Sequence, residues 1–409
     1  MKIERREFLK MGAVGVLGAG TMMLLPRTYA QQADIDPSKA KNKLVVVQLS
    51  GGNDGLNTVV PYGDSAYYTK RPTLAVKPEN VLKIDDRVGF APQFAEMKQV
   101  YDQGRLAVLQ AAGYPTSNRS HFFSMDVWHT ADLTAQDRFG WLGKFIDGLQ
   151  TPEKDPLVGL SVGIMPKAMK ASTLSVPALE SLDRYQWTPY GNDPIETSRQ
   201  IRAFSDMYSE TKDSTTLMDL LQNIGKDALV SSTDLKNASR SYLPSVNYPL
   251  NSILSINLKL IAQLIGSGLG TRIYYLNIGG FDTHASQVQQ HQNLLTTISQ
   301  SLGAFHEDLK DQGNGDRVMT MLFSEFGRRV AQNGSNGTDH GKGGPMFVLG
   351  GGVKGGMYGP EPNLNDLNDG DVNPAIDFRH VYATILEKWM GADSKKVMGQ
   401  RFPLLDFVK

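Results

Sequence analysis

The chain has 409 residues, carries 42 basic and 42 acidic side chains, and contains no cysteine. The lack of cysteine excludes disulfides, thiol nucleophiles, and zinc or iron–sulfur sites built from thiolates. Zero net charge, with no basic cluster in the mature part, gives no support to a nucleic-acid partner or to an anionic membrane surface. The hydrophobic content of 40% suffices for one large α/β domain or two smaller ones.

The first thirty residues have the pattern of an export signal. Arg5 and Arg6 stand before Phe-Leu-Lys, and an apolar run rich in glycine and alanine follows over residues 11–25. A charged start, a short apolar run and small residues at a cut site are typical of a signal peptide rather than a membrane span. The twin arginine indicates the Tat route. We therefore predict a Tat signal peptide over residues 1–30 and a flexible linker over residues 31–42.

This leader also predicts where the mature chain works. Tat substrates cross the membrane already folded, and often with a cofactor inserted, so the Tat translocon is the partner expected during export. We expect a periplasmic or extracellular mature protein that has no membrane span.

The first strong strand pattern covers residues 44–49. These residues are apolar on both faces until Gln48, as expected of a central parallel strand. A glycine-rich turn follows and contains Asp54, and glycines let a backbone approach a ligand closely. Asp54 is therefore a candidate metal ligand at a strand end, although the same residue could simply form an Asx-turn.

A helix pattern over residues 92–103 and a strand over residues 106–109 lead to a turn rich in hydroxyl groups. There, Ser117 and His121 are four residues apart, so both can face one pocket if a helix starts at this point. A hydroxyl at a helix start lies over free amide groups and the positive end of the helix dipole, which favours an alkoxide or a bound anion. The commoner use of such a residue is as an N-cap. The residues expected to face inward in the following helix are Phe122, Met125, and Trp128 or His129.

The middle of the chain carries fewer signals. We expect a strand within residues 157–164, and the aromatic stretch 183–193 is suited to form a wall for a substrate. Residues 194–239 have a helical pattern that is polar on one side, and residues 251–266 form a strongly apolar helix. We predict that residues 165–245 form a helical and loop cap inserted into the domain.

A second strand end carries both a carboxylate and an imidazole. A short β-branched and aromatic strand over residues 272–276 is broken by two glycines, and Asp282 and His284 follow before a long helix over residues 287–311. Open α/β sheets place their chemistry at the carboxyl ends of strands, so these two side chains are candidate metal ligands. The alternatives are that Asp282 is only a cap or turn residue and that His284 lies on a surface loop.

A third strand end follows the run 317–323. It carries Glu325, a further candidate ligand, with Arg328 close behind, and then a glycine-rich loop that carries His340 and enters a short strand over residues 345–349. His340 could be an ordinary loop histidine. Three carboxylates on one rim repel one another, so a metal, an arginine or protons must lie among them. With only oxygen and imidazole ligands, the divalent metals that fit are zinc, manganese, magnesium, calcium or iron.

The order of these elements resembles the alkaline-phosphatase-like superfamily. The leader and four motifs resemble one branch of it, the exported bacterial family known as domain of unknown function 1501. The motifs are Gly51-Gly52-Asn53-Asp54-Gly55, Arg119-Ser120-His121-Phe122, Gly280-Phe281-Asp282-Thr283-His284 and Ser324-Glu325-Phe326-Gly327-Arg328. The likeness covers nearly the whole mature chain. It implies a single α/β domain over residues 43–409, folded as a three-layer sandwich in which helices flank a mostly parallel central sheet.

The resemblance also implies roles for single residues. In the superfamily, carboxylates and histidines at strand ends hold one or two divalent metals, and a nucleophile stands at a helix start. The matching nucleophile is Ser117, with Thr116 and Ser120 as neighbours that could take its role. The matching metal ligands are Asp54, Asp282, His284, Glu325 and His340.

Two positions depart from the superfamily pattern. Phe326 occupies the place of a metal-binding histidine, and Glu325 replaces an aspartate. The second metal site is therefore expected to be incomplete, and Arg328 is a candidate source of positive charge in place of a metal. A sulfatase-type maturation motif is also absent from the sequence, which argues against a formylglycine sulfatase.

Together these residues predict an exported, metal-dependent hydrolase of phosphate or sulfate esters. Ser117 would attack, and Arg119 or Arg328 would clamp the anionic group in bidentate fashion, with His121 in the same pocket. The alternative is a degenerate member that binds an anion, a glycan or a protein at the cell envelope without turnover. The expected substrate is a small anionic ester or a glycan.

Overall fold

The computed structural model describes the chain from residue 39 onward, with gaps. The described residues are 39, 41–149, 155–180, 194–209 and 234–409. The chain divides into two units, residues 1–31 and residues 32–409, and the described residues all belong to the second unit. The predicted signal peptide, almost all of the predicted linker and the aromatic stretch 183–193 lie outside the described residues.

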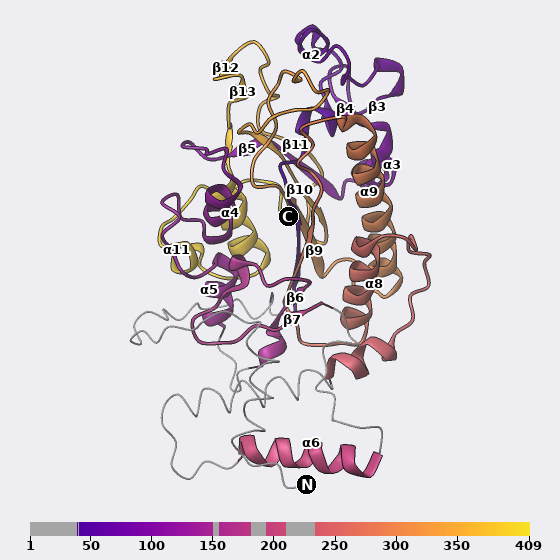
Figure 1. Cartoon of the computed structure of the whole chain (residues 1–409), viewed down its shortest axis with the longest axis vertical. Helices are drawn as coiled ribbons and strands as arrows, with labels where there is room; N and C mark the ends of the chain where they lie inside the picture. The colour runs from indigo at the N-terminus through magenta and orange to yellow at the C-terminus, as the bar shows by residue number, and fades with distance from the viewer. Residues whose placement is uncertain (1–38, 40, 150–154, 181–193, 210–233) are drawn as a thin grey trace. The chain divides into compact units, whose positions relative to one another are not determined.

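A nine-stranded sheet forms the centre of the described residues (Figure 1). Its strands, in spatial order, are β11 (Gly356–Tyr358), β5 (Leu106–Gly113), β10 (Gly344–Gly350), β9 (Val318–Phe323), β1 (Lys43–Leu49), β8 (Ile273–Ile278), β6 (Gly159–Val162) and β7 (Ala178–Leu179), with β14 (Ile376–Asp377) paired to β5. Strand β10 runs antiparallel to both neighbours, and the other pairings are parallel. The predicted mostly parallel central sheet is confirmed.

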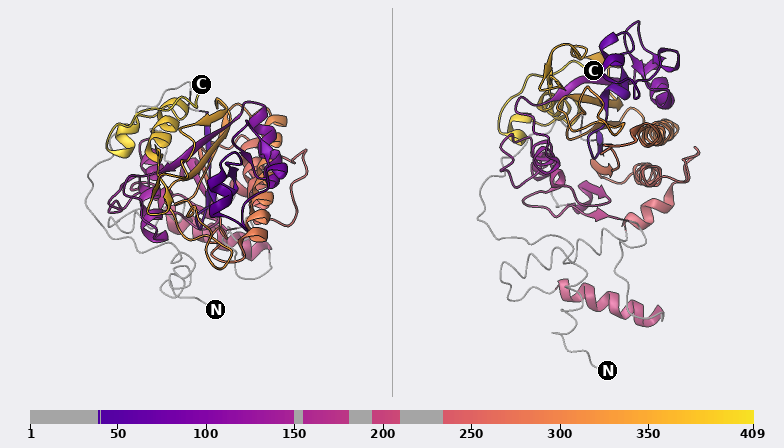
Figure 2. Two further views of the ribbon diagram at one scale, coloured as in Figure 1. Left: turned by 90° about the horizontal axis from the view of Figure 1, so that it is seen from above. Right: turned by 45° about the horizontal axis from the view of Figure 1, so that its top comes forward.

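Helices cover both faces of this sheet (Figures 1 and 2). The helices on one face are α3 (Ala95–Asp102), α8 (Ile253–Gly266) and α9 (Gln287–Asp311), and those on the other are α4 (His121–Thr130), α5 (Trp141–Asp147), α10 (Phe378–Thr384) and α11 (Ser394–Met398). Strand β1 shows why both faces are buried. Its Val45 and Val47 pack into the core with α8 and α9, whereas Leu44 and Val46 pack into the core with α4 and α10. The predicted three-layer arrangement is confirmed.

Smaller elements cap the edge of the sheet at which the parallel strands end. They are α2 (Ser65–Lys70), a three-stranded sheet of β2 (Val59–Val60), β4 (Gly89–Phe90) and β3 (Leu82–Lys83), and a pair formed by β12 (Leu367–Asn368) and β13 (Asp371–Val372). A separate helix, α6 (Pro194–Ser209), covers the start of the helical pattern expected over residues 194–239. Among the described residues, no helix is long and apolar enough to cross a membrane.

The prediction for the inward face of α4 is wrong at its first position. Phe122 is 87% exposed, whereas Trp128 and His129 are buried as expected. The buried face of α4 is set by Ser124, Val127 and Trp128. Phe122 precedes Ser124 by two residues, which turns it about 200° around the helix axis, and therefore toward solvent.

Three histidines in the core make the stability of the protein sensitive to acid. Burial lowers the pKa of His129, His291 and His306 to about 4. In the unfolded chain each imidazole gains a proton near pH 6.5, but in the folded chain it stays neutral until about pH 4. We expect the contribution of these histidines to the unfolding free energy to be fully present above pH 6.5. Below that pH the unfolding free energy should decrease, by up to about 1.4 kcal/mol per pH unit for each histidine.

Urea unfolding at pH 7.5, 6 and 5 measures this slope. His306→Gln should reduce the slope of unfolding free energy against pH by the contribution of roughly one proton taken up on unfolding. His121, whose pKa is raised chiefly by its hydrogen bond to Glu325, acts in the opposite direction but is only one group against three. Equal unfolding free energies at pH 7.5 and pH 5 would contradict the expectation.

Candidate metal centre

The carboxyl ends of β1, β8 and β9 meet at one edge of the sheet because the three strands are adjacent and parallel. The loop after β8 brings Asp282 and His284 to this edge, and the loop after β9 brings Glu325. Strand β10 is antiparallel to β9, so its beginning lies at the same edge, and the loop before it brings His340. The first residue of α4, His121, completes the group.

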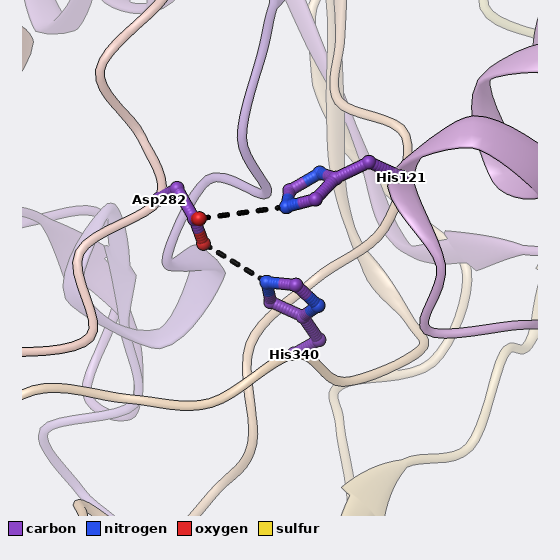
Figure 3. A group of neighbouring side chains, drawn as sticks. All are labelled: His121, Asp282 and His340. Atoms are coloured by element: carbon purple, nitrogen blue, oxygen red, sulfur yellow. Dashed lines mark hydrogen bonds and ion pairs between the residues drawn. The ribbon is translucent and has the colours of Figure 1, made fainter.

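Asp282 lies between two imidazoles from distant parts of the chain (Figure 3). Its Oδ1 is 2.9 Å from Nε2 of His340, and its Oδ2 is 3.5 Å from Nε2 of His121. Atoms of these three side chains that could bind a metal all lie within 4.8 Å of one another. His284 adjoins them, because its Nε2 is 2.9 Å from Oδ1 of Asp282 and 3.0 Å from Nε2 of His340. We call these four residues the histidine cluster.

Each histidine of the cluster has an oxygen acceptor behind it. Nδ1 of His121 is 2.9 Å from Oε1 of Glu325, and Nδ1 of His284 is 3.0 Å from Oδ1 of Asp339. Nδ1 of His340 is 2.8 Å from the carbonyl oxygen of Arg119. Because a carboxylate or a carbonyl can only accept, each Nδ1 has an acceptor to which a proton on that nitrogen can be donated.

If the proton of each neutral imidazole is on Nδ1, the three Nε2 atoms present lone pairs to one carboxylate, and if it is on Nε2 they donate to Asp282 instead. In the first case the Nε2 atoms of His284 and His340, which are 3.0 Å apart, would turn two bare lone pairs toward each other and repel. A divalent cation would relieve this repulsion, and metal-bound histidines characteristically donate their other N–H to a carboxylate or carbonyl. Three imidazoles and one carboxylate suit zinc, and also manganese or iron, better than calcium or magnesium. The donor set therefore fits a single transition-metal ion.

Arg328 keeps the carboxylate of the cluster charged. Its guanidinium is 2.6 Å from Oδ1 of Asp282, and it also donates to the carbonyl oxygens of Gly51, Gly52, Phe281 and Thr338. Partial burial by itself would raise the pKa of Asp282, but the hydrogen bonds from Arg328 and His340 and the charge of Arg328 bring it well below its usual range. Asp282 is therefore an anion at any working pH.

The sequence as a whole matches one family. A family model described as "Protein of unknown function (DUF1501)" matches residues 41–402. The chain belongs to the DUF1501 family. The likeness to this family that the motifs indicated is thus confirmed, and no curated protein matches the sequence.

Three solved structures illustrate what the DUF1501 chain is similar to in shape. The PsFucS1 sulfatase from Pseudoalteromonas sp. shares 11% identity at a TM-score of 0.38, with 97% of this chain and 72% of that chain covered. A protein in the alkaline phosphatase superfamily from Vibrio parahaemolyticus shares 9% identity at a TM-score of 0.36, with 98% of this chain and 78% of that chain covered. The phosphonate monoester hydrolase SpPMH from Silicibacter pomeroyi shares 9% identity at a TM-score of 0.37, with 88% of this chain and 77% of that chain covered. All three likenesses are distant.

Asp54 of the DUF1501 chain does not join the histidine cluster but forms a buried ion pair. Both of its oxygens accept from Nη1 of Arg71, at 2.6 and 2.8 Å, and Gln287 donates to it as well. Burial alone would raise the pKa of Asp54, but the charges of Arg71 and His291 and these hydrogen bonds lower it. Sequence reasoning gave no attention to Arg71, which lies in an irregular segment directly after α2 and belongs to no periodic pattern.

Glu325 lies behind the cluster in this DUF1501 protein rather than at its centre. Its side chain is fully buried, and its Oε1 accepts both from the backbone N–H of Gly51, at 2.8 Å, and from Nδ1 of His121. The predicted ligand thus orients His121, the residue that sequence reasoning had assigned to catalysis. Phe326 packs its ring beside both His121 and His340, with ring centroids 4.9 and 4.6 Å away, and fills the space next to them.

The remaining catalytic candidates of the DUF1501 chain lie in the turn before α4. The hydroxyl of Ser117 donates to the carbonyl of Tyr114 at 2.5 Å, so it is used within its own turn. Helix α4 begins at His121 with Ser120 as its N-cap, and the exposed hydroxyl of Ser120 makes no capping bond. The guanidinium of Arg119 pairs with Asp371 at 2.6 Å and with Asp369 at 2.8 Å, and that of Arg328 is bonded to the protein as described above.

Glu325→Gln is expected to lower the zinc affinity of the DUF1501 protein by about 10–100-fold, because an amide can present its N–H₂ to Nδ1 of His121 and reverse the tautomer. Asp339→Asn is the matched change behind His284. Its effect should be smaller, since Asp339 is 52% exposed and water can replace it. Competition with a chromophoric chelator measures both. Wild-type affinity in Glu325→Gln would show that the glutamate has no part in metal binding.

Proposed function

We propose that this chain is an exported, metal-dependent hydrolase of phosphate or sulfate esters, with one divalent metal held by His121, Asp282, His284 and His340. The observation that carries the proposal is the arrangement of the three imidazoles. Each has an acceptor on Nδ1, and each turns Nε2 toward Asp282. With the imidazole protons on Nδ1, such an arrangement is costly without a cation in addition to Arg328, and it has no evident role in packing, because Asp282 is 46% exposed.

The chemistry divides between the metal and the chain. A divalent metal bound here would act as a Lewis acid toward an ester oxygen and would lower the pKa of water to about 7. Glu325 and Asp339 hold two of the ligands in orientation, and Arg328 keeps Asp282 ionised. Helix α4 begins within the cluster, so its first-turn N–H groups and the positive end of its dipole favour an anionic group bound there.

Ser117 remains our proposed nucleophile, and Ser120 is its rival. Ser120 is exposed, directly precedes His121 and has a free hydroxyl in its own cap, whereas the hydroxyl of Ser117 is bonded to Tyr114. Comparing Ser117→Ala with Ser120→Ala separates the two. The nucleophile variant should lose kcat by several orders of magnitude while it keeps its zinc, and the other should stay near wild type.

The test of the function is elemental analysis joined to turnover. Protein recovered after export should contain about one equivalent of a transition metal and should hydrolyse members of a panel of phosphate and sulfate esters. Treatment with a chelator should remove both metal and activity, and restoring the metal should restore activity. Metal-loaded protein that releases neither phosphate nor sulfate from any ester of the panel would refute the hydrolase.

A second candidate function is binding without turnover, and it is favoured by the buried pair of Asp54 and Arg71. The guanidinium of Arg71 pairs with Asp54, the carboxylate that the resemblance assigns to a second cation site. Phe326 fills the space beside His121. One metal bound in stoichiometric amount, tight binding of inorganic phosphate or sulfate, and no hydrolysis would together support this alternative.

A further inference from the structure

Phe122 directly follows His121 of the histidine cluster and leaves 87% of its surface exposed to solvent. It belongs to the first turn of α4, and side chains of a helix tilt toward the helix start, so its ring lies at the end of α4 that reaches the cluster. A single exposed apolar side chain is common on a protein surface and needs no explanation. Its surroundings decide whether Phe122 belongs to a site.

The face of α4 that carries Phe122 lies over the ends of β1 and β8. Phe122 and His129 are seven residues apart, which is nearly two full turns, so they share one face of the helix. On that face, Nε2 of His129 is 2.8 Å from Oε1 of Gln48 and 3.1 Å from the hydroxyl of Tyr275. Phe122 lies about 10 Å farther along the helix axis, toward the histidine cluster. Its ring is therefore placed at the carboxyl edge of the sheet.

The end of β8 is an open strip that leads to the cluster. Asn277 is exposed and points to the same side of the sheet as Tyr275, because side chains alternate along a strand. Gly279 and Gly280 are exposed as well, and a Cβ added to Gly279 would meet no heavy atom within 4 Å beyond its chain neighbours. Asp282 of the cluster follows two residues after Gly280.

A second large apolar side chain is exposed beside this strip. Strand β6 is the parallel neighbour of β8, and Ile164, two residues after β6, is 86% exposed. The loop after β6 runs beside α4, because Nζ of Lys167 is 3.2 Å from Oδ2 of Asp126. Asp126 lies one turn after Phe122 on the same face of the helix. We call Phe122, Ile164 and the strip 277–280 the shelf.

We propose that the shelf binds the alcohol part of the ester and that Phe122 gives the protein a preference for aryl over alkyl esters. This inference rests on the proposed function, because the anionic part of the same molecule lies at the histidine cluster. Aromatic rings that stack on one another, or meet edge to face, gain affinity in addition to the buried area. The occupant is a substrate rather than a second copy of the chain, because a copy seated on the shelf would also cover the strip that leads to Asp282.

Phenylphosphonate and methylphosphonate are the probes. They carry the same anionic group, and their carbon–phosphorus bond replaces the ester bond, so binding is measured without turnover. Isothermal titration uses full-length, zinc-loaded protein recovered after export, at a pH where both probes are dianions. Wild-type protein should bind phenylphosphonate about tenfold more tightly than methylphosphonate, the value of one aromatic contact. Phe122→Ala should abolish this preference, and Phe122→Tyr, which keeps the ring, should retain it.

Two further variants locate the effect. Leu250→Ala removes an equally exposed apolar side chain from the segment before α8, and it should leave the preference unchanged. Ile164→Ser should reduce the preference by roughly half as much on a logarithmic scale, because an aliphatic side chain offers less contact to a ring than an aromatic one does. Circular dichroism and zinc content establish that each variant is folded and loaded.

Three results would overturn the inference. The first is an equal preference for phenylphosphonate in wild type and Phe122→Ala, and the second is wild-type protein that does not distinguish the probes. The third is a dimer that dissociates in Phe122→Ala while the preference persists, since the shelf would then be an interface between copies.

Turnover separates this inference from the function on which it rests. For phenyl phosphate, Phe122→Ala should raise KM about tenfold and leave kcat near wild type. If phenyl phosphate is hydrolysed but neither KM nor the probe preference changes in Phe122→Ala, the assignment of the shelf fails and the hydrolase stands. If the preference depends on Phe122 but metal-loaded protein hydrolyses no ester, the hydrolase fails and the shelf remains a binding site for aryl anions.

Discussion

Asp282→Asn is expected to weaken zinc binding by more than about 100-fold and to remove ester hydrolysis. Loss of a partner behind a ligand already costs about 10–100-fold, and Asp282 is the only carboxylate among the four cluster residues. An amide cannot supply the negative charge around which the three imidazoles converge, and its N–H₂ group would face Arg328. Isothermal titration with zinc, together with the rate for the best ester of the panel, gives both quantities.

The control for this prediction is Asp316→Asn, which removes the same charge from a side chain that is 93% exposed. It should bind zinc and turn over as wild type does. His340→Gln provides an independent check, because it removes a nitrogen ligand but leaves the pair of Asp282 and Arg328 in place. Wild-type zinc affinity in both Asp282→Asn and His340→Gln would rule out the histidine cluster as the metal centre.

The second large effect concerns stability. Arg71→Met is expected to lower the unfolding free energy by about 3–5 kcal/mol, because it leaves the fully buried carboxylate of Asp54 without its cation. The carbonyls of Arg329 and Val330 would also lose their donor, since Arg71 bonds to both at 2.8 Å. Chemical denaturation followed by tryptophan fluorescence measures the change.

The double variant Arg71→Met with Asp54→Leu should recover part of this loss, since no buried charge then remains. Arg87→Met, which breaks an exposed pair with Glu361, should not measurably alter stability. If Arg71→Met unfolds at the same denaturant concentration as wild type, the buried pair does not hold the loop after β1 in place.

The sequence carried enough information for the sheet and for the edge at which the candidate site lies. Strand β1 reads as a continuous apolar run because both of its faces are covered, and the periodic helix over residues 287–311 coincides with α9. Polar residues placed directly after such strands must gather at one edge, which is why Asp282 and His284 could be selected together, whereas His340, which precedes β10, was selected on the family resemblance.

The sequence could not show how deeply each side chain is buried at that edge. Glu325 and His121 both reach it, but only packing decides that the glutamate lies behind and the imidazole in front. The sequence also could not identify the ion-pair partner of Asp54, because Arg71 follows Asp54 by seventeen residues in a segment with no periodicity. The start of α4 at His121, rather than nearer Ser117, was also set by the tertiary structure, and it changes which hydroxyl stands at the cap.

The antiparallel course of β10 has a consequence for how the protein matures. Because β10 begins where its neighbours end, the last histidine of the cluster, His340, comes from a loop near the end of the chain, 219 residues after His121. The cluster is therefore incomplete until translation has passed residue 340. A product of premature termination before this loop would lack one imidazole of the proposed metal site.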